Sequence, residues 1–220
     1  MGLASWAGSI AGVSTKPGAA TKKQVYALSH NCLLTRIPEK SIKYISLLRG
    51  INVSGQKRIQ MADLAKVYES IKLTDVKTYI QSGNVVFSAP ESLAEKLGSK
   101  IEKAIQKAYG FKADVVLRTA DEWQQILKSN PFLKKTKKPE DQLYVALLRE
   151  TAEDQTAELL PYCKAKEKFV FSGRELYLHY PEKFGNTKLT LQVIENKLGV
   201  IATVRNWNTM QALGELVETK

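Results

Sequence analysis

The sequence contains very little cysteine and histidine, which argues against several kinds of site. The two cysteines, Cys32 and Cys163, form no metal-ligand spacing and no disulfide framework. The two histidines, His30 and His179, are too few for a histidine-based metal site. We therefore expect no metal and no cofactor, and so few thiols fit a reducing cytoplasm best.

Long apolar runs and catalytic arrangements are missing as well. No run approaches the ~18 apolar residues that a membrane span needs, so we expect no membrane partner. No Ser/His/Asp or Cys/His constellation stands out, and we interpret Cys163 as a packing residue. The sequence leaves enzymatic activity undecided.

Acidic residues are scarce at the start of the chain. The net charge is +11, and residues 1–43 contribute +5 of it, because they hold six Lys or Arg residues and one Glu. The remaining +6 makes the rest moderately basic, which favours anionic ligands but is a weak argument for nucleic acid. Residues 1–42 show no helical or strand periodicity that persists along the segment, so we expect a disordered or non-native extension. A mispredicted start explains it better than a targeting peptide.

What the sequence does contain is an internal repeat. Residues 44–49 (YISLLR) return as residues 144–149 (YVALLR). The segment YIQSG at residues 79–83 returns as FVFSG at residues 169–173. The segment VLR at residues 116–118, with the helix after it, returns as TVR at residues 203–205 with its helix. A duplicated unit is therefore expected to form the scaffold.

Hydrophobic periodicity gives both copies the same order of elements. Predicted strands lie at 44–49, 76–81, 85–88, 113–118, 143–149, in a hairpin at 168–180, and at 202–205. Predicted helices lie at 61–71, 93–108, 119–128, 152–162 and 188–198, with a last helix ending near 217. Strand–helix–strand–strand–helix–strand is the order of the ferredoxin-like unit. We predict an α+β fold made by tandem duplication of this unit, each copy with an added C-terminal helix.

The predicted boundaries follow from the repeat. The first subdomain covers residues 43–133, a basic linker covers 134–141, and the second subdomain covers 142–220. The first strand is apolar on both faces, so both faces of its sheet should be buried. That burial disfavours an open, RNA-binding sheet with exposed aromatic rings.

The loop after the first strand is a candidate ligand site. Two glycines with Arg49, Asn52 and Lys57 are groups that a polyanion-binding loop would contain. The spacing is not that of a Walker A motif. The alternative is a plain connection whose glycines serve turns.

Two further segments supply polar groups. In the hairpin turn, Gln81 and Asn84 could support a ligand, although the fold does not guarantee that this turn meets the first loop. After the last strand come Arg205, Asn206 and Asn208, where a helix N-terminus without a carboxylate could bind an anion. Alternatively, an Asn caps that helix and Trp207 packs in the core.

Three segments together resemble one family. They are YISLLRGINV (44–53), TYIQSGNVVF (78–87) and VRNWNT (204–209). The chain is similar to the bacterial domain of unknown function 1697 family from about residue 43 to 216. The resemblance implies two ferredoxin-like subdomains and no established activity, and it excludes the 42-residue extension.

These observations support three hypotheses. The first is binding of a small anionic or phosphorylated ligand by Arg49, Asn52, Lys57, Gln81, Asn84, Arg205, Asn206 and Asn208. The second is nucleic-acid binding through the basic linker at residues 134–138, Lys57, Arg58 and the tail, with a steep salt dependence. The third is a structural or oligomerising module, because such sheets pair readily. The oligomeric state is left open.

Overall fold

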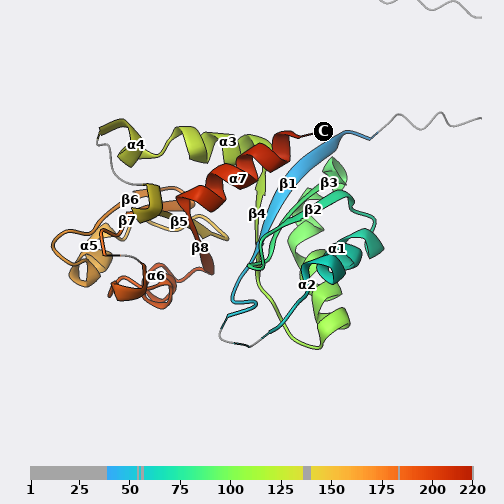
Figure 1. Ribbon diagram of the computed structural model, residues 1–220, viewed down its shortest axis with the longest axis horizontal. Coiled ribbons are helices and arrows are strands. Elements are labelled where there is room, and N and C mark those ends of the chain that lie inside the picture. Colours follow the sequence, from blue (N-terminus) through green and yellow to red (C-terminus); the bar gives the residue numbers. More distant parts are fainter. Residues whose placement is uncertain (1–38, 54, 56, 136–139, 183, 220) are drawn as a thin grey trace, which may run out of the picture. The chain divides into compact units, whose positions relative to one another are not determined.

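Two antiparallel sheets form the framework of the computed structural model (Figure 1). It describes residues 39–53, 55, 57–135, 140–182 and 184–219, and the predicted extension lies almost wholly outside them. From Glu39 on, the described residues belong to one compact unit.

The first sheet has the strand order β2-β3-β1-β4. Its strands and helices are β1 (Ser41–Leu48), α1 (Met61–Ser70), β2 (Thr74–Tyr79), β3 (Asn84–Pro90), α2 (Ala94–Tyr109), β4 (Val115–Thr119) and α3 (Ala120–Lys128). Gly110 ends α2 in a left-handed conformation, with φ +75°. A capping box opens α3, with the side chains of Thr119 and Glu122 each accepting the other residue's backbone N–H.

The second sheet has the order β6-β7-β5-β8, which matches the first. Its elements are α4 (Pro131–Lys135), β5 (Leu143–Leu148), α5 (Thr156–Leu159), β6 (Lys168–Ser172), β7 (Glu175–His179), α6 (Leu191–Leu198), β8 (Ala202–Asn206) and α7 (Trp207–Glu218). The helix predicted at 152–162 is wrong in length. Only α5 is α-helical, and a 3-10 turn containing Pro161 follows it, since proline lacks the N–H that continues a helix.

Both faces of the first sheet are buried along β1, as predicted, whereas its edge strand β2 is exposed or half-buried. Tyr44 and Leu48 of β1 face a cluster formed with α1 and α2, whereas Ile45 and Leu47 face a central cluster. The central cluster also contains side chains of α3, α7 and the second sheet. In Figure 1 the helices α3 and α7 run side by side across the two sheets, and they pack on each other. The added helices and the other half thus supply the cover.

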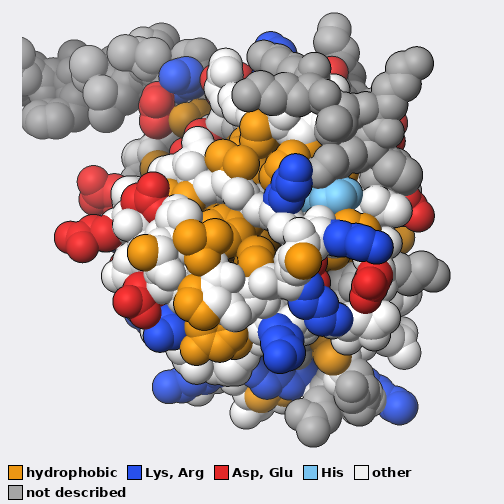
Figure 2. All heavy atoms as spheres, turned by 90° about the vertical axis from the view of Figure 1, so that its left-hand side faces the viewer, with side chains coloured by type: hydrophobic (Ala, Val, Ile, Leu, Met, Phe, Trp, Pro, Cys, Tyr) orange, Lys and Arg blue, Asp and Glu red, His pale blue; other side chains and the backbone are white. Residues whose placement is uncertain are grey.

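The second sheet has its own outer cluster against α5 and α6. Its end of the molecule exposes apolar side chains, with Leu160 57% exposed and Val170 39% exposed. Figure 2 views the molecule from this side and shows hydrophobic side chains gathered in the middle of the face, with Lys and Arg beside them. In the part of the chain that is described, no helix combines the length and the apolarity needed to cross a membrane.

Candidate functional site

Arg49, at the end of β1, is bound to a carboxylate from the other half of the chain. The first half is the part that forms the first sheet, and the second half is the part that forms the second sheet. Its Nε and Nη2 donate to the two carboxylate oxygens of Glu195, both at 2.6 Å. Glu195 also accepts the backbone N–H of Ala202, so it is fixed on α6. Because the carboxylate bonds the charged form, the pKa of Arg49 is raised.

An arginine of the second half makes the corresponding ion pair with the first half. Arg149, at the end of β5, pairs with Glu102 of α2 at 2.9 Å. Both arginines also approach Asp114, at 4.0 Å from Arg49 and 3.9 Å from Arg149. The two strand-end arginines therefore tie the halves together, and an anion would have to displace Glu195 to reach the fork of Arg49.

Arg205 of β8 reaches into the first half. Its Nε donates to Asn84 Oδ1 at 2.6 Å, and its Nη2 donates to the carbonyls of Leu48 and Ser82. Its Nη1 donates to Thr203 and to the Val204 carbonyl. All five guanidinium N–H groups are thus occupied by protein acceptors.

Arg118 of β4 makes the corresponding contacts in the second half. It donates to the carbonyls of Leu148 and Arg174 and to the carboxylate of Glu175 at 3.0 Å. Glu175 pairs with Leu147 in the second sheet, and Asn84 pairs with Leu47 in the first, so the two occupy equivalent places. The first half therefore has an amide where the second has a carboxylate.

This difference leaves Arg205 without a countercharge. Among the described residues, no carboxylate forms an ion pair with it. Burial lowers the pKa of Arg205 to about 10, because removal from water disfavours the charged form. Burial also lowers the pKa of Arg118, where Glu175 acts in the opposite direction.

Asn52 closes the loop after β1. Its side chain accepts the N–H of Ile59 at 2.8 Å and donates to the Ile59 carbonyl at 2.9 Å. It also donates to the carbonyl of Gln81 at 2.7 Å, which joins the loop to the β2–β3 turn. The sequence left the contact between this turn and the loop open, and the structure forms it. In an antiparallel pair the end of β1 lies beside the start of β3, and Leu48 N–H bonds Gly83.

The remaining predicted residues are spread out. Lys57 turns away to the Lys112 carbonyl at 2.9 Å and lies over the Phe111 ring. Asn206 caps α7 by accepting the N–H of Thr209 at 2.9 Å. Trp207 is buried and Asn208 is exposed. Thus the structure brings together Arg49, Asn52, Asn84, Arg205 and the Gln81 backbone. For Asn206 and Trp207 the alternative prediction is confirmed: Asn206 caps the last helix and Trp207 packs in the core.

A cavity of about 520 Å³ opens on the outer side of the loop. It is lined by Asn52, Gly55, Arg58, Ile59 and Gln60. Gln60 is the N-cap of α1, and its side chain makes no capping bond. Its carbonyl accepts the N–H groups of Asp63 and Leu64, so among the described residues only the N–H groups of Met61 and Ala62 in the first turn have no acceptor. The expected set of ligand contacts left out Arg58 and Gln60. The signal for them is a helix start preceded by Arg-Ile-Gln instead of Ser, Thr, Asp or Asn.

Groups for catalysis or metal binding are sparse. In the described ranges, no cluster of three or more His, Cys, Asp or Glu side chains could hold a metal ion. Burial, with a smaller contribution from Glu167, raises the pKa of the Cys163 thiol to about 11. A thiol with that pKa is a poor nucleophile at neutral pH.

Comparison with known proteins identifies the chain at family level. A family model described as "Protein of unknown function (DUF1697)" matches residues 42–177, which is more than half of the sequence. The chain belongs to the DUF1697 family. This confirms the resemblance seen in the sequence, although residues 204–209, which contributed to it, lie outside the matched region.

One solved structure supports the fold of this DUF1697 chain. It is described as the conserved bacterial protein SP0830 from Streptococcus pneumoniae, with 23% sequence identity and a TM-score of 0.65. The match covers 81% of this chain and all of that one. At this identity the likeness concerns the fold alone. A search of curated proteins gave no match.

Proposed function

We propose that the protein binds a small anionic or phosphorylated ligand in the cavity at the start of α1. The observation that carries the proposal is an uncapped helix N-terminus that opens beside Arg58. Free N–H groups and the positive end of the helix dipole attract anions, and a guanidinium supplies paired donors for phosphate or carboxylate oxygens.

The scaffold leaves this place available while occupying the others. Arg49 and Arg205 give their guanidinium donors to protein acceptors, and Asn206 caps α7. Asn52 holds the loop in shape. Asp63 in the first turn of α1 competes for the positive helix end, but it is engaged by Lys66 at 3.0 Å. We therefore assign ligand contact to Arg58 and the α1 amides, with Asn52 as their support.

Calorimetric titration with inorganic phosphate and with ribose 5-phosphate tests the proposal. A hydrogen bond to a charged group is worth about 1.5–3 kcal/mol. Arg58→Gln should therefore weaken binding roughly ten- to hundredfold. Lys107→Gln is the matched control, because Lys107 is an exposed lysine on α2. Equal affinities for the wild type and Arg58→Gln, or no binding of either probe, would reject the proposal.

A second variant tests the helix terminus itself. Gln60→Asp places a carboxylate at the N-cap, where it can accept the first-turn N–H groups. The protein should gain about 0.5–1 kcal/mol of stability from the cap and dipole, while phosphate affinity should fall. A fall in both quantities would instead indicate a distorted loop.

The other hypotheses stay predictions. The basic linker lies partly outside the described residues, and the structure adds no contact that favours nucleic acid. A steep salt dependence of oligonucleotide affinity would support that hypothesis, since phosphate contacts release counterions. Light scattering tests the oligomerising module, for which the apolar face in Figure 2 is the obvious surface. The cytoplasmic location also stays a prediction.

We further propose that the two halves are copies of one ferredoxin-like unit, with the predicted boundaries 43–133 and 142–220. The shared strand order and the reciprocal arginine contacts support this. An experimental structure in which β1–β4 and β5–β8 superpose with their helices would support duplication. Different helix positions over the two sheets would argue against it.

A further inference from the structure

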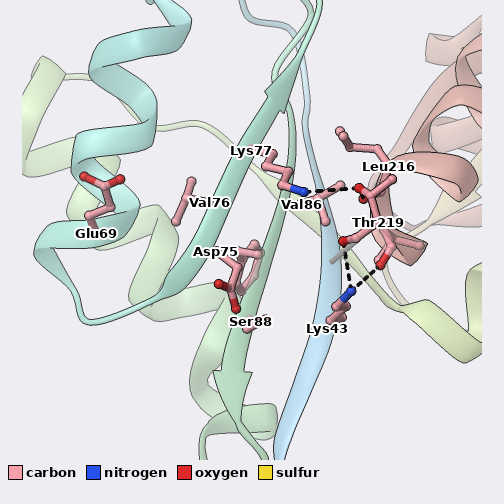
Figure 3. Close-up of a pocket in the computed structure, with 11 residues that line it drawn as sticks. Lys43, Glu69, Asp75, Val76, Lys77, Val86, Ser88, Leu216 and Thr219 are labelled. Carbon is pink, nitrogen blue, oxygen red and sulfur yellow. Dashed lines mark hydrogen bonds between the residues drawn. The ribbon is translucent and has the colours of Figure 1, made fainter.

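A second cavity, of about 590 Å³, lies beside the edge strand β2 and the end of α7. Figure 3 shows its residues: Lys43 and Lys77 extend toward α7, Asp75 lies on β2, and Glu69 projects from α1. Val86 and Leu216 contribute apolar surface between these charged groups. The volume lies in the range of small-molecule sites.

The edge strand β2 is irregular where it lines this cavity. Thr74 pairs with Ser88 and Lys77 pairs with Val86, and the register shifts between them. Asp75 and Val76 therefore lie opposite the single residue Phe87 of β3, and Asp75 takes a φ of +52°. The backbone groups of this bulge lie on the edge strand of the sheet, where an added chain could bond them.

The charges of the cavity are separated. Lys43 Nζ donates to the carbonyls of Val217 and Thr219 at 2.8 and 3.2 Å, and Lys77 Nζ donates to Thr219 Oγ1 at 3.1 Å. An ammonium has three N–H donors, so both lysines keep further donors. Glu69 and Asp75 are exposed. In the described part of the chain, none of these four groups forms an ion pair.

We propose that this cavity binds a short peptide with free termini, as an elongated zwitterion. The ligand carboxylate would lie at Lys43 and Lys77, and its ammonium group at Asp75 and Glu69. An apolar side chain of the ligand would lie on Val86 and Leu216, and the peptide amide of the ligand would form hydrogen bonds with the β2 bulge. A simple anion is disfavoured by the two carboxylates, and a simple cation is disfavoured by the two lysines, whereas a zwitterion satisfies both ends.

Titration with leucyl-leucine and its two blocked forms tests this arrangement. N-acetyl-leucyl-leucine lacks the ammonium group, and leucyl-leucinamide lacks the carboxylate. We expect leucyl-leucine to bind, and each blocked form to bind with an affinity at least about tenfold lower. Asp75→Asn should weaken leucyl-leucine but leave the acetylated peptide unchanged, and asparagine tolerates the positive φ at this position. Lys77→Gln should weaken leucyl-leucine but leave the amide unchanged.

Controls make each outcome decisive. Lys107→Gln and Arg58→Gln should leave peptide binding unchanged, so failure of the phosphate site and failure of this site can be told apart. Absence of leucyl-leucine binding up to about 1 mM would overturn the proposal. Equal binding of the free and acetylated peptides would overturn it as well. If Lys77→Gln unfolds the protein because it loses the α7 contact, then Asp75→Asn with the acetylated peptide decides alone.

Discussion

The ion pair between Arg49 and Glu195 should contribute strongly to stability, and a double-mutant cycle can measure it. We would compare Arg49→Met, Glu195→Gln and the double variant with the wild type. The pair is bidentate at 2.6 Å, with side chains only 30% and 10% exposed. For such a charged, partly buried contact we expect a coupling free energy of about 1.5–3 kcal/mol.

The control cycle uses an exposed pair in the same protein. Lys40 and Glu91 are joined at 3.3 Å, with side chains 72% and 52% exposed. Their coupling should be below about 1 kcal/mol, because solvent screens the pair and the lysine loses side-chain entropy. Comparing the two coupling free energies thus shows how much burial and geometry, and not charge alone, contribute to the Arg49–Glu195 pair.

Urea unfolding followed by tryptophan fluorescence is the assay. Trp123 and Trp207 are buried in the central cluster between the sheets, so their emission reports on the packing of the two halves. The slope with urea should be unchanged among the variants, which licenses comparison of the free energies of unfolding. A coupling for Arg49 and Glu195 no larger than that of the control pair would refute the structural role given to Arg49.

Three further predictions concern backbone, capping and pH. Gly83→Ala should cost well over 1 kcal/mol in urea unfolding, because a Cβ at this position, where φ is +71°, would lie 2.8 Å from Leu48 Cβ. Gly110→Ala is the control: φ is +75° but the space is open, so the cost should be only about 1 kcal/mol. Equal losses of stability in the two variants would contradict the packing argument. Thr119→Ala should cost about 1 kcal/mol by the same assay, because it removes the α3 cap, and no loss would show that the cap adds nothing. Stability should fall as pH rises above about 10, because burial raises the pKa of three tyrosines in the folded state while unfolded tyrosines ionise there. They are Tyr68, Tyr177 and Tyr180. The lowered pKa values of Arg205 and Arg118 act in the opposite direction, but the three tyrosines outnumber them. Urea unfolding at pH about 8 and about 10.5 should therefore show a net loss of stability, whereas equal stability would count against tyrosine burial.

Local sequence patterns predicted most of the elements. The apolar stripe from Met61 to Tyr68 is the buried face of α1, and the alternation in β1 predicted burial on both sides. Such patterns work because a periodicity of residue types belongs to one segment and needs no distant partner. The helix expected at 152–162 failed where Pro161 interrupts the continuing backbone hydrogen bonds.

The candidate site was less predictable because its partners are distant in sequence. Arg49 and Glu195 are 146 residues apart, and Arg205 and Asn84 are 121 residues apart. Residue type marked both arginines as potential anion ligands, but only the tertiary contacts show that their donors are occupied. The loop and the turn meet through Asn52, because the antiparallel pairing of β1 with β3 brings them to the same end of the sheet.

The exchange of arginines between the halves has a consequence for the order of synthesis on the ribosome. The carbonyls of Leu48 and Ser82 and the side chain of Asn84 receive hydrogen bonds from Arg205. Arg205 is made 121 residues after Asn84. The nascent first half must therefore wait, with these acceptors solvated, until β8 has emerged, so its maturation completes only when the second half arrives.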